Sequence, residues 1–203
     1  MARLAGLPLQ LFKRLMLRGS AFKGSYGKLR TLYTLEDPWG MSSDKEQHRF
    51  EETNRQLINI SPNYPRILEL GCGEGHQTVF LARLTDHIYG LDVSEKAVLR
   101  ARRRLPRGIF HAGCMEDVNN LFPDETFSLV TACEVLYYAK DPARVLSVLQ
   151  GCADNIYVSN YAERAHDMMA HFSGPGWSRL SPIRHENTVW ECHLWQSSQT
   201  GCT

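Results

Sequence analysis

Three glycines follow, at alternate positions, a short apolar run that contains one carboxylate. The run is 67–70, its carboxylate is Glu69, and the glycines are Gly71, Gly73 and Gly75. Glycine leaves the turn without side chains, so a ligand can approach the backbone closely, and the N–H groups at the start of a following helix point toward that ligand. Glu69 beside the turn favours a ligand with an amine or a positive charge over a pyrophosphate alone.

A second carboxylate stands where nucleotide-binding folds place one. The apolar run 88–91 ends in Asp92, roughly 20 residues after the glycine turn, which is the spacing of the ribose-binding carboxylate in a βαβ unit. A strand, a glycine turn, a helix and a second strand with a terminal Asp therefore predict a ligand that contains a nucleoside. The alternative is a glycine turn that serves only tight packing of the helix against the strand, and this leaves Asp92 without a role.

Residues 69–75 resemble the first motif of class I S-adenosylmethionine-dependent methyltransferases. A dinucleotide-binding fingerprint has glycine where this chain has His76, so the pattern favours S-adenosylmethionine over NAD. The resemblance implies that Glu69 and the glycine loop bind the methionine end of that cofactor and that Asp92 binds its ribose. The alternatives are an NAD-linked oxidoreductase and a catalytically silent binding partner with a methyltransferase fold.

The order of the elements predicts the fold. Strand and helix patterns alternate between residues 66 and 160, and two further strands, over 177–184 and 188–196, are joined by a short turn. Such alternation is typical of an α/β domain with a doubly wound sheet. We expect the Rossmann-like class I methyltransferase fold with an N-terminal helical cap. Its mostly parallel sheet should have seven strands, with only the last strand antiparallel and the first strand away from the edge.

The loop after the third expected strand, 109–111, stands where this family binds adenine. Position 114 is Cys114, where many members have Asp, so the chain departs from the family pattern there. The resemblance implies that the backbone of Met115 meets the adenine ring. It also implies that Glu116 or Asp117 accepts a hydrogen bond from the exocyclic amine. Asp117 equally fits a cap at the start of a helix.

The turn after the fourth expected strand, 134–138, is where we expect the transferred methyl group, because ligands of an open parallel sheet bind outside the carboxyl ends of its strands. Methyl transfer from a sulfonium is an in-line displacement that needs no metal. An amine acceptor must be neutral to attack and a hydroxyl acceptor needs a base, and the candidate catalytic residues are Glu134, Tyr137 and Tyr138. A pair of tyrosines at a strand end is also often part of the core.

A narrower resemblance concerns the acceptor. Residues 32–33, 37–39 and 134–138 are similar to the NodS type of N-methyltransferase, which acts on the glucosamine end of nodulation oligosaccharides. We expect the acceptor pocket between the turn 134–138 and a cap around Tyr33 and Trp39. Aromatic faces pack well on sugar rings, and a carboxylate can hold an ammonium group. The expected acceptor is a small-molecule or glycan-like amine or hydroxyl.

The N-terminal segment is basic. Residues 1–35 contain seven Lys and Arg and no Asp or Glu, and their apolar residues recur at helical spacing, which predicts an amphipathic basic helix. We expect 1–60 to be a basic extension with cap helices and 61–203 to be the cofactor-binding core. The extension fits a helix that packs on the core with solvated charges, or an organelle transit peptide. It also fits a segment that binds a membrane surface or another anionic partner through residues 1–30.

Composition narrows the class of protein. A chain of 203 residues with 43% hydrophobic residues fits one α/β domain with an extension, and a net charge of +1 argues against a nucleic-acid partner. The six cysteines are scattered without a C-x-x-C pair, which favours reduced thiols in the cytoplasm over a disulfide framework or a zinc site. No apolar run is long enough to span a membrane.

Overall fold

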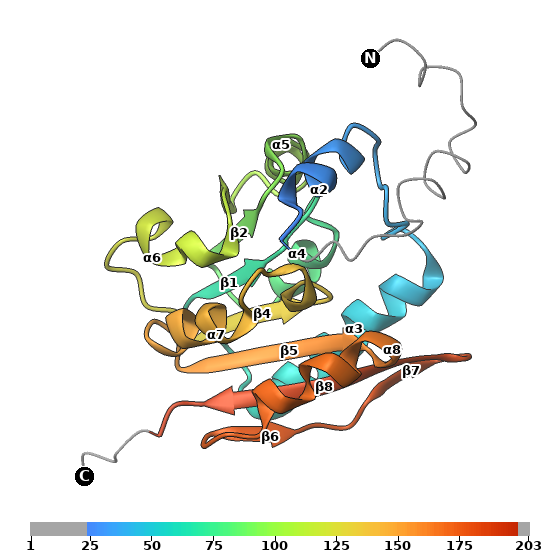
Figure 1. The fold of residues 1–203 in the computed structure, drawn as a ribbon. Helices are drawn as coiled ribbons and strands as arrows, with labels where there is room; N and C mark the ends of the chain where they lie inside the picture. The colour runs from blue at the N-terminus through green and yellow to red at the C-terminus, as the bar shows by residue number, and fades with distance from the viewer. Residues whose placement is uncertain (1–23, 199–203) are drawn as a thin grey trace.

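One mixed sheet organises the chain. The computed structural model describes residues 24–198, and in it an eight-stranded sheet has the order β3-β2-β1-β4-β5-β8-β6, with β7 also paired to β8 (Figure 1). The strands are β1 (Ile67–Leu70), β2 (Ile88–Asp92), β3 (Ile109–Ala112), β4 (Leu129–Cys133), β5 (Asn155–Tyr161), β6 (Trp177–Arg179), β7 (Ile183–His185) and β8 (Thr188–Gln196).

The strand order reverses at β1. The chain builds β1, β2 and β3 outward in one direction, then returns to place β4 and β5 on the other side of β1, all in parallel register. Every residue of β1 is buried, as expected for a central strand covered on both faces. A reversal of this kind opens a crevice at the carboxyl ends of the strands on either side of it, here β1 and β4.

The last part of the sheet differs in one respect from the expectation. β8 is antiparallel to β5, as predicted, but the strand expected over 177–184 is divided into β6 and β7, so the sheet has eight strands and not seven. The division falls at Leu180–Pro182, where Pro182 has no N–H to donate to a neighbouring strand. An edge strand tolerates this interruption because only β8 pairs with it.

Helices cover both faces of the sheet. Leu57, Leu81 and Trp190 belong to the core on one face, which is covered by α3 (Asp44–Ile60) and α4 (His76–Leu81), and α5 (Glu95–Arg104) packs beside α4 on β2 and β3. The opposite face packs against α6, α7 and η3. The remaining elements are α2 (Tyr26–Leu32), α6 (Val118–Leu121), α7 (Pro142–Gln150), α8 (Ala162–Ala165), η1 (Met115–Asp117), η2 (Leu136–Tyr138) and η3 (His166–Phe172).

The segment before β1 forms a cap at the carboxyl ends of the strands. Its α2 lies beside α5, and α3 is fastened to the core where Asn54 Nδ2 donates to the carbonyl of Phe80 at 2.6 Å (Figure 1). Residues 1–23, which carry most of the expected basic helix, lie outside the described residues. The division of the chain into an N-terminal extension with cap helices over 1–60 and a cofactor-binding core over 61–203 stays a prediction. None of the helices within 24–198 has both the length and the apolar character that a membrane crossing requires.

Candidate functional site

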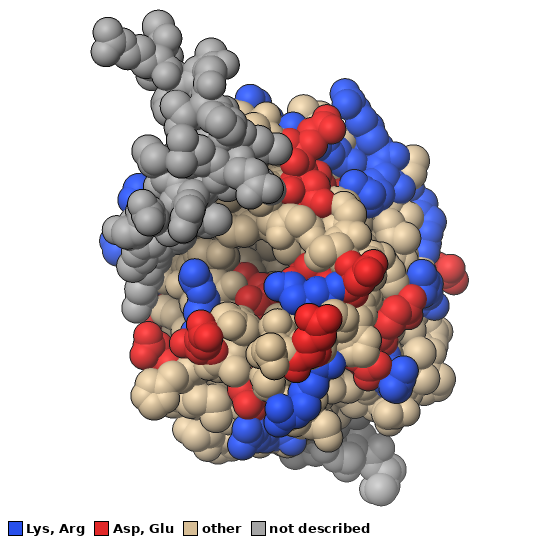
Figure 2. All heavy atoms as spheres, turned by 90° about the vertical axis from the view of Figure 1, so that its right-hand side faces the viewer, with Lys and Arg blue, Asp and Glu red and all other residues tan. Residues whose placement is uncertain are grey.

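A cavity of about 290 Å³ lies at the carboxyl ends of β1, β2 and β4, under the cap. The molecular surface at these strand ends has a hollow, and atoms of Asp and Glu side chains are visible inside it (Figure 2). The structure brings most of the predicted site residues to this cavity. Those that line it are Glu69, Gly71, Gly73, Asp92, Met115, Glu134, Tyr137 and Tyr138, whereas Gly75, Glu116 and Asp117 stand outside the lining.

The three glycines adopt the left-handed backbone region that other residues rarely enter, with φ of +67°, +51° and +79° at Gly71, Gly73 and Gly75. A Cβ on Gly71 would lie 2.5 Å from Val135 Cγ2, and one on Gly73 would lie 2.8 Å from the hydroxyl of Tyr33. The missing side chain of Gly71 thus leaves space for the loop after β4, and that of Gly73 leaves space for the cap. A Cβ on Gly75 would meet the backbone of α5 at 3.1 Å, so tight packing explains this third glycine.

Glu69 is a buried carboxyl at the base of the cavity. Its Oε2 accepts a hydrogen bond from Thr78 Oγ1 in α4. Burial raises the pKa of Glu69 to about 8, although the Thr78 hydroxyl and the charge of Arg49 oppose the rise. A cationic group in the cavity would favour the ionised form, so this carboxyl is suited to an ammonium ligand.

Asp92 is held by two backbone donors at the end of β2. Its Oδ2 accepts from the N–H of Gly73 at 3.0 Å, and its Oδ1 accepts from the N–H of Ser94 at 2.8 Å. Burial raises the pKa of Asp92 to about 6 despite these two bonds. An ionised carboxylate has about four acceptor positions. Two therefore remain for hydroxyl donors from a ligand.

Glu74 is a site residue that the sequence reasoning missed. Its carboxylate accepts from the N–H of Asp37 at 3.0 Å and from Arg100 Nη1 at 2.6 Å. Arg100 Nη1 also donates to the carbonyls of Tyr33 and Leu35. This pair of the buried Glu74 and the half-buried Arg100 ties the cap to the glycine loop. An acidic residue between two motif glycines was the available signal, but its partners lie too far along the chain to be inferred.

Arg49 is a second residue that was missed. It lies on α3 with only 2% of its surface exposed, and it lines the cavity. Its Nε donates to Glu46 at 2.8 Å, and its Nη1 donates to the side-chain oxygen of Gln77 at 3.0 Å. The nearby carboxylates, Glu46 first among them, outweigh the effect of burial and raise the pKa of Arg49. A fully buried guanidinium at a cavity wall is an anchor for a ligand carboxylate.

The predicted adenine loop is only partly at the cavity. Met115 lines the wall formed with Leu91, but Glu116 faces α2, where its two oxygens accept from the hydroxyl of Tyr26 at 2.8 Å. Asp117 stands at the start of α6 and makes no side-chain capping bond there. Contacts of Glu116 and Asp117 with an adenine ring stay predictions, as does the contact of Met115.

The loop after β4 holds Glu134 in an unusual conformation. Its φ is +57°, which is uncommon for a residue with a side chain and is concentrated at functional sites. Its carboxylate accepts from the hydroxyl of Tyr137 at 2.8 Å and from the N–H of Tyr161. Burial raises the pKa of Glu134, while Arg49 and these two donors oppose the rise. The carboxylate is therefore oriented from both sides before any ligand binds.

Aromatic rings border the outer part of the cavity. Tyr137 and Tyr138 have ring centroids 4.5 Å apart, and Trp39 of the cap lies 6.2 Å from Tyr138. The indole N–H of Trp39 donates to the hydroxyl of Tyr33 at 3.1 Å. The guanidinium of Arg164 lies over the Tyr137 ring at 5.1 Å. The cap and the loop after β4 thus meet in one aromatic wall, as the sequence predicted.

Comparison with known proteins places this site in context. Residues 68–153 match the family described as a methyltransferase domain. Nodulation protein S of Sinorhizobium fredii is 27% identical over 138 residues, which are 68% of this chain and 63% of that protein. Ubiquinone biosynthesis O-methyltransferase of Aromatoleum aromaticum is 34% identical over a segment that covers 43% of this chain and 38% of that protein. The chain spans less than two thirds of the length of these relatives.

Solved structures share the fold. The N-methyltransferase NodS from Bradyrhizobium japonicum, in complex with S-adenosyl-L-homocysteine, superposes with a TM-score of 0.71 at 18% identity, over 86% of this chain and 98% of that one. Magnesium protoporphyrin IX methyltransferase from Synechocystis, with bound S-adenosylmethionine, gives a TM-score of 0.60 at 16% identity, over 95% of this chain and 99% of that one. The predicted class I methyltransferase fold and the NodS-like resemblance are confirmed.

Proposed function

This chain has the class I methyltransferase fold and carries a methyltransferase domain over residues 68–153, and on that premise we propose that it is an S-adenosylmethionine-dependent methyltransferase. The acceptor is an amine or hydroxyl of a small molecule or a glycan-like compound. The observation that carries the proposal is the convergence of Glu69, Asp92 and the glycine loop on one cavity at the point where the strand order reverses.

The side chains of the cavity fit this cofactor. S-adenosylmethionine, when bound, supplies an activated methyl group on a sulfonium. An amino-acid end with one positive and one negative charge would meet two buried groups of opposite sign, since Glu69 suits the ammonium and Arg49 suits the carboxylate. Arg49 uses two of its five N–H donors on Glu46 and Gln77 and a third on the sulfur of Met41, so two donors remain for a ligand.

The nucleoside end fits the other half of the cavity. Asp92, which Gly73 and Ser94 hold in place, keeps acceptor positions for the ribose hydroxyls, and Met115 and Leu91 are apolar lining residues suited to the base. Any side chain on Gly73 would meet Tyr33, so the loop is bare where the cap and the ligand approach it.

Glu134 is our candidate for handling the proton of the acceptor. It is held by Tyr137 and by the N–H of Tyr161, and its raised pKa brings it closer to the pH at which a base works. As a carboxylate it can hold an ammonium and then take up the proton that an amine must lose. Tyr138 and Trp39 offer the aromatic faces that pack on a sugar or another ring. The N-methyltransferase and O-methyltransferase relatives support both kinds of acceptor atom.

Calorimetric titration with S-adenosylmethionine and S-adenosylhomocysteine tests the proposal, with NADH as the control ligand. Both sulfur compounds should bind and NADH should not. Asp92→Ala should weaken binding by about 1–3 kcal/mol, because it removes charge-assisted bonds to the ribose. Asp154→Ala is the matched control, since Asp154 is an exposed carboxylate that stands outside the cavity. Unchanged affinity in Asp92→Ala would mean that the ribose lies elsewhere.

The non-catalytic alternative makes a different prediction. A silent binding partner would bind the cofactor and release no S-adenosylhomocysteine with any member of a panel of amine and hydroxyl acceptors. The comparisons lend no support to the oxidoreductase alternative. A cytoplasmic location and an anionic partner for residues 1–30 remain part of the proposal, tested by fractionation of cells and by binding at low and high salt.

A further inference from the structure

One exposed surface is basic and is not used by the proposed reaction. We name it the basic face and define it as Arg30 of α2 with Lys96, Leu99, Arg102 and Arg103 of α5, all of which are exposed. Residues three and four apart are neighbours on a helix, so Lys96, Arg102 and Arg103 surround Leu99, which is 52% exposed.

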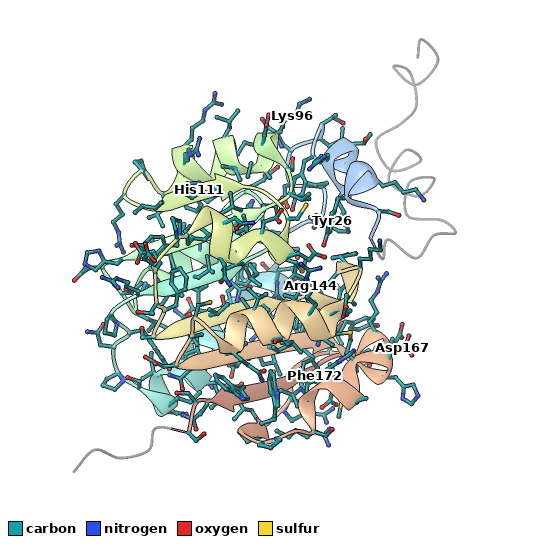
Figure 3. All side chains as sticks on the ribbon, turned by 60° about the vertical axis from the view of Figure 1, so that its left-hand side comes forward. Tyr26, Lys96, His111, Arg144, Asp167 and Phe172 are labelled. Carbon is teal, nitrogen blue, oxygen red and sulfur yellow. The ribbon has the colours of Figure 1, made fainter. Side chains whose placement is uncertain are left out.

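The two helices contribute to one continuous surface. Arg30 Nε donates at 3.1 Å to the carbonyl of Val93, the residue before the N-cap Ser94 of α5. This bond places Arg30 beside the first turn of α5, where Lys96 stands at the outer surface on the side of α2 (Figure 3).

The positive charge of this surface is not neutralised by ion pairs. Across residues 24–198, none of its four cations forms a salt bridge with a carboxylate. Arg30 and Arg102 donate to backbone carbonyls, which leaves their charge in place. α5 has a single acidic residue, Glu95, in its first turn. Glu95 is itself four residues from Leu99, but the four cations of the basic face outnumber it, so this surface retains a net attraction for anions.

We propose that the basic face docks on an anionic lipid surface. Cations attract phosphate headgroups within a Debye length, and an apolar side chain among them gains by entering the boundary between headgroups and acyl chains. A nucleic acid suits this surface less well, because single-stranded binding uses aromatic stacking and none of these five residues is aromatic. This inference does not depend on the proposed reaction, since no residue of the basic face lines the cavity.

Sedimentation of the full chain with phosphatidylcholine vesicles, with and without phosphatidylglycerol, tests the charge. Only the anionic vesicles should bind, and salt should weaken the binding. Charge reversal in the double variant Lys96→Glu with Arg103→Glu should weaken it by about tenfold or more. The matched control is the double variant Arg144→Glu with Arg184→Glu, which changes the net charge equally. Arg144 is exposed on α7 (Figure 3), and Arg184 is exposed on β7. It should stay within about twofold of the parent.

A second pair of variants tests the apolar contact. Leu99→Ser should weaken vesicle binding at low and at high salt, whereas Ile58→Ser should leave it unchanged. Ile58 is the matched control because it is 50% exposed on α3, outside the basic face. Circular dichroism melts of all four variants show whether each one is folded.

Three outcomes would overturn the proposal. If both double variants weakened vesicle binding equally, the attraction would depend on the overall charge of the protein and not on the basic face. Parental vesicle binding in the Lys96 and Arg103 double variant would place any membrane contact elsewhere in the chain. Loss of binding to an RNA oligonucleotide in that variant, with vesicle binding unchanged, would make this surface a nucleic-acid site.

Discussion

The variants Gly71→Ala and Gly40→Ala together test whether Val135 leaves room for a side chain at Gly71 in the glycine loop. The two glycines have nearly the same backbone conformation, with φ of +67° at Gly71 and +71° at Gly40. Their surroundings differ. A Cβ on Gly71 would lie 2.5 Å from Val135 Cγ2 and 2.9 Å from Val135 Cβ, whereas a Cβ on Gly40 would have no atom within 4 Å. The pair therefore separates backbone strain from steric overlap.

The expected magnitudes follow from these distances. The left-handed conformation costs a residue with a Cβ about 1–2 kcal/mol, and this cost applies to both variants. Val135 is 8% exposed and packed in the core, so it cannot swing away from a new methyl group. Overpacking at such a site costs about 1–3 kcal/mol more. We therefore expect the free energy of unfolding to fall by about 1–2 kcal/mol in Gly40→Ala and by about 2–5 kcal/mol in Gly71→Ala.

Urea denaturation and cofactor calorimetry provide the two measurements. In Gly71→Ala the loop must shift away from Val135, so affinity for S-adenosylmethionine should fall by about tenfold or more, which is at least 1.4 kcal/mol. Gly40→Ala should keep the parental affinity because Gly40 lies outside the cavity lining. If Gly71→Ala loses no more stability and no more affinity than Gly40→Ala, the loop has room for a side chain and the argument from close approach is wrong.

Four further predictions concern the site and the segment before α2. Binding of S-adenosylmethionine at pH 7 should release about one proton, because Glu69, with a pKa of about 8, is mostly protonated in the free chain and an ammonium favours its ionised form. Calorimetry in two buffers of different ionisation enthalpy measures this release. An unchanged release in Glu69→Gln would assign the proton to another group. Since the folded chain holds that proton more tightly than the unfolded chain, the stability of the free protein should fall as pH rises from about 4.5 to 8, and Glu69→Gln should flatten this fall. Glu134→Gln and Tyr138→Phe should slow methyl transfer while cofactor affinity stays within a few-fold, and parental rates in both would place the acceptor pocket elsewhere. Removal of residues 1–23, which leaves α2 intact, should raise the apparent Michaelis constant for the acceptor mainly at low salt. A rise of the same size at high salt would exclude an electrostatic role for this segment.

Local patterns in the sequence determined the core of the site. The run that contains Glu69, the alternate glycines and the second run ending in Asp92 each occupy a few consecutive residues, and the backbone preferences of glycine and the apolar pattern of buried strands act at that range. Both carboxylates consequently lie at the cavity that the sequence predicted. The family resemblance, not these local patterns, placed the cap opposite the turn after β4; in the structure Trp39 lies against Tyr138, and Tyr33 lines the same cavity.

Packing decided what local patterns do not encode. The expected strand over 177–184 contains Pro182, and its place at the sheet edge lets the chain break there into β6 and β7. The neighbour for which each glycine leaves room is likewise visible only in three dimensions, since Gly75 meets α5 and Gly71 meets Val135.

The charged groups around the cavity are the clearest case of tertiary control. Arg49 and Gln77 are 28 residues apart, Glu74 and Arg100 are 26 apart, and Asp37 and Glu74 are 37 apart. Glu74 stands between two motif glycines, but nothing in the sequence around Asp37 and Arg100 marks them as its partners. These contacts exist because α3, α5 and the cap pack on the sheet at angles set by many apolar side chains together. The sequence alone therefore determined the strand–turn–helix that can bind a nucleoside, and the tertiary structure decided which charges surround it.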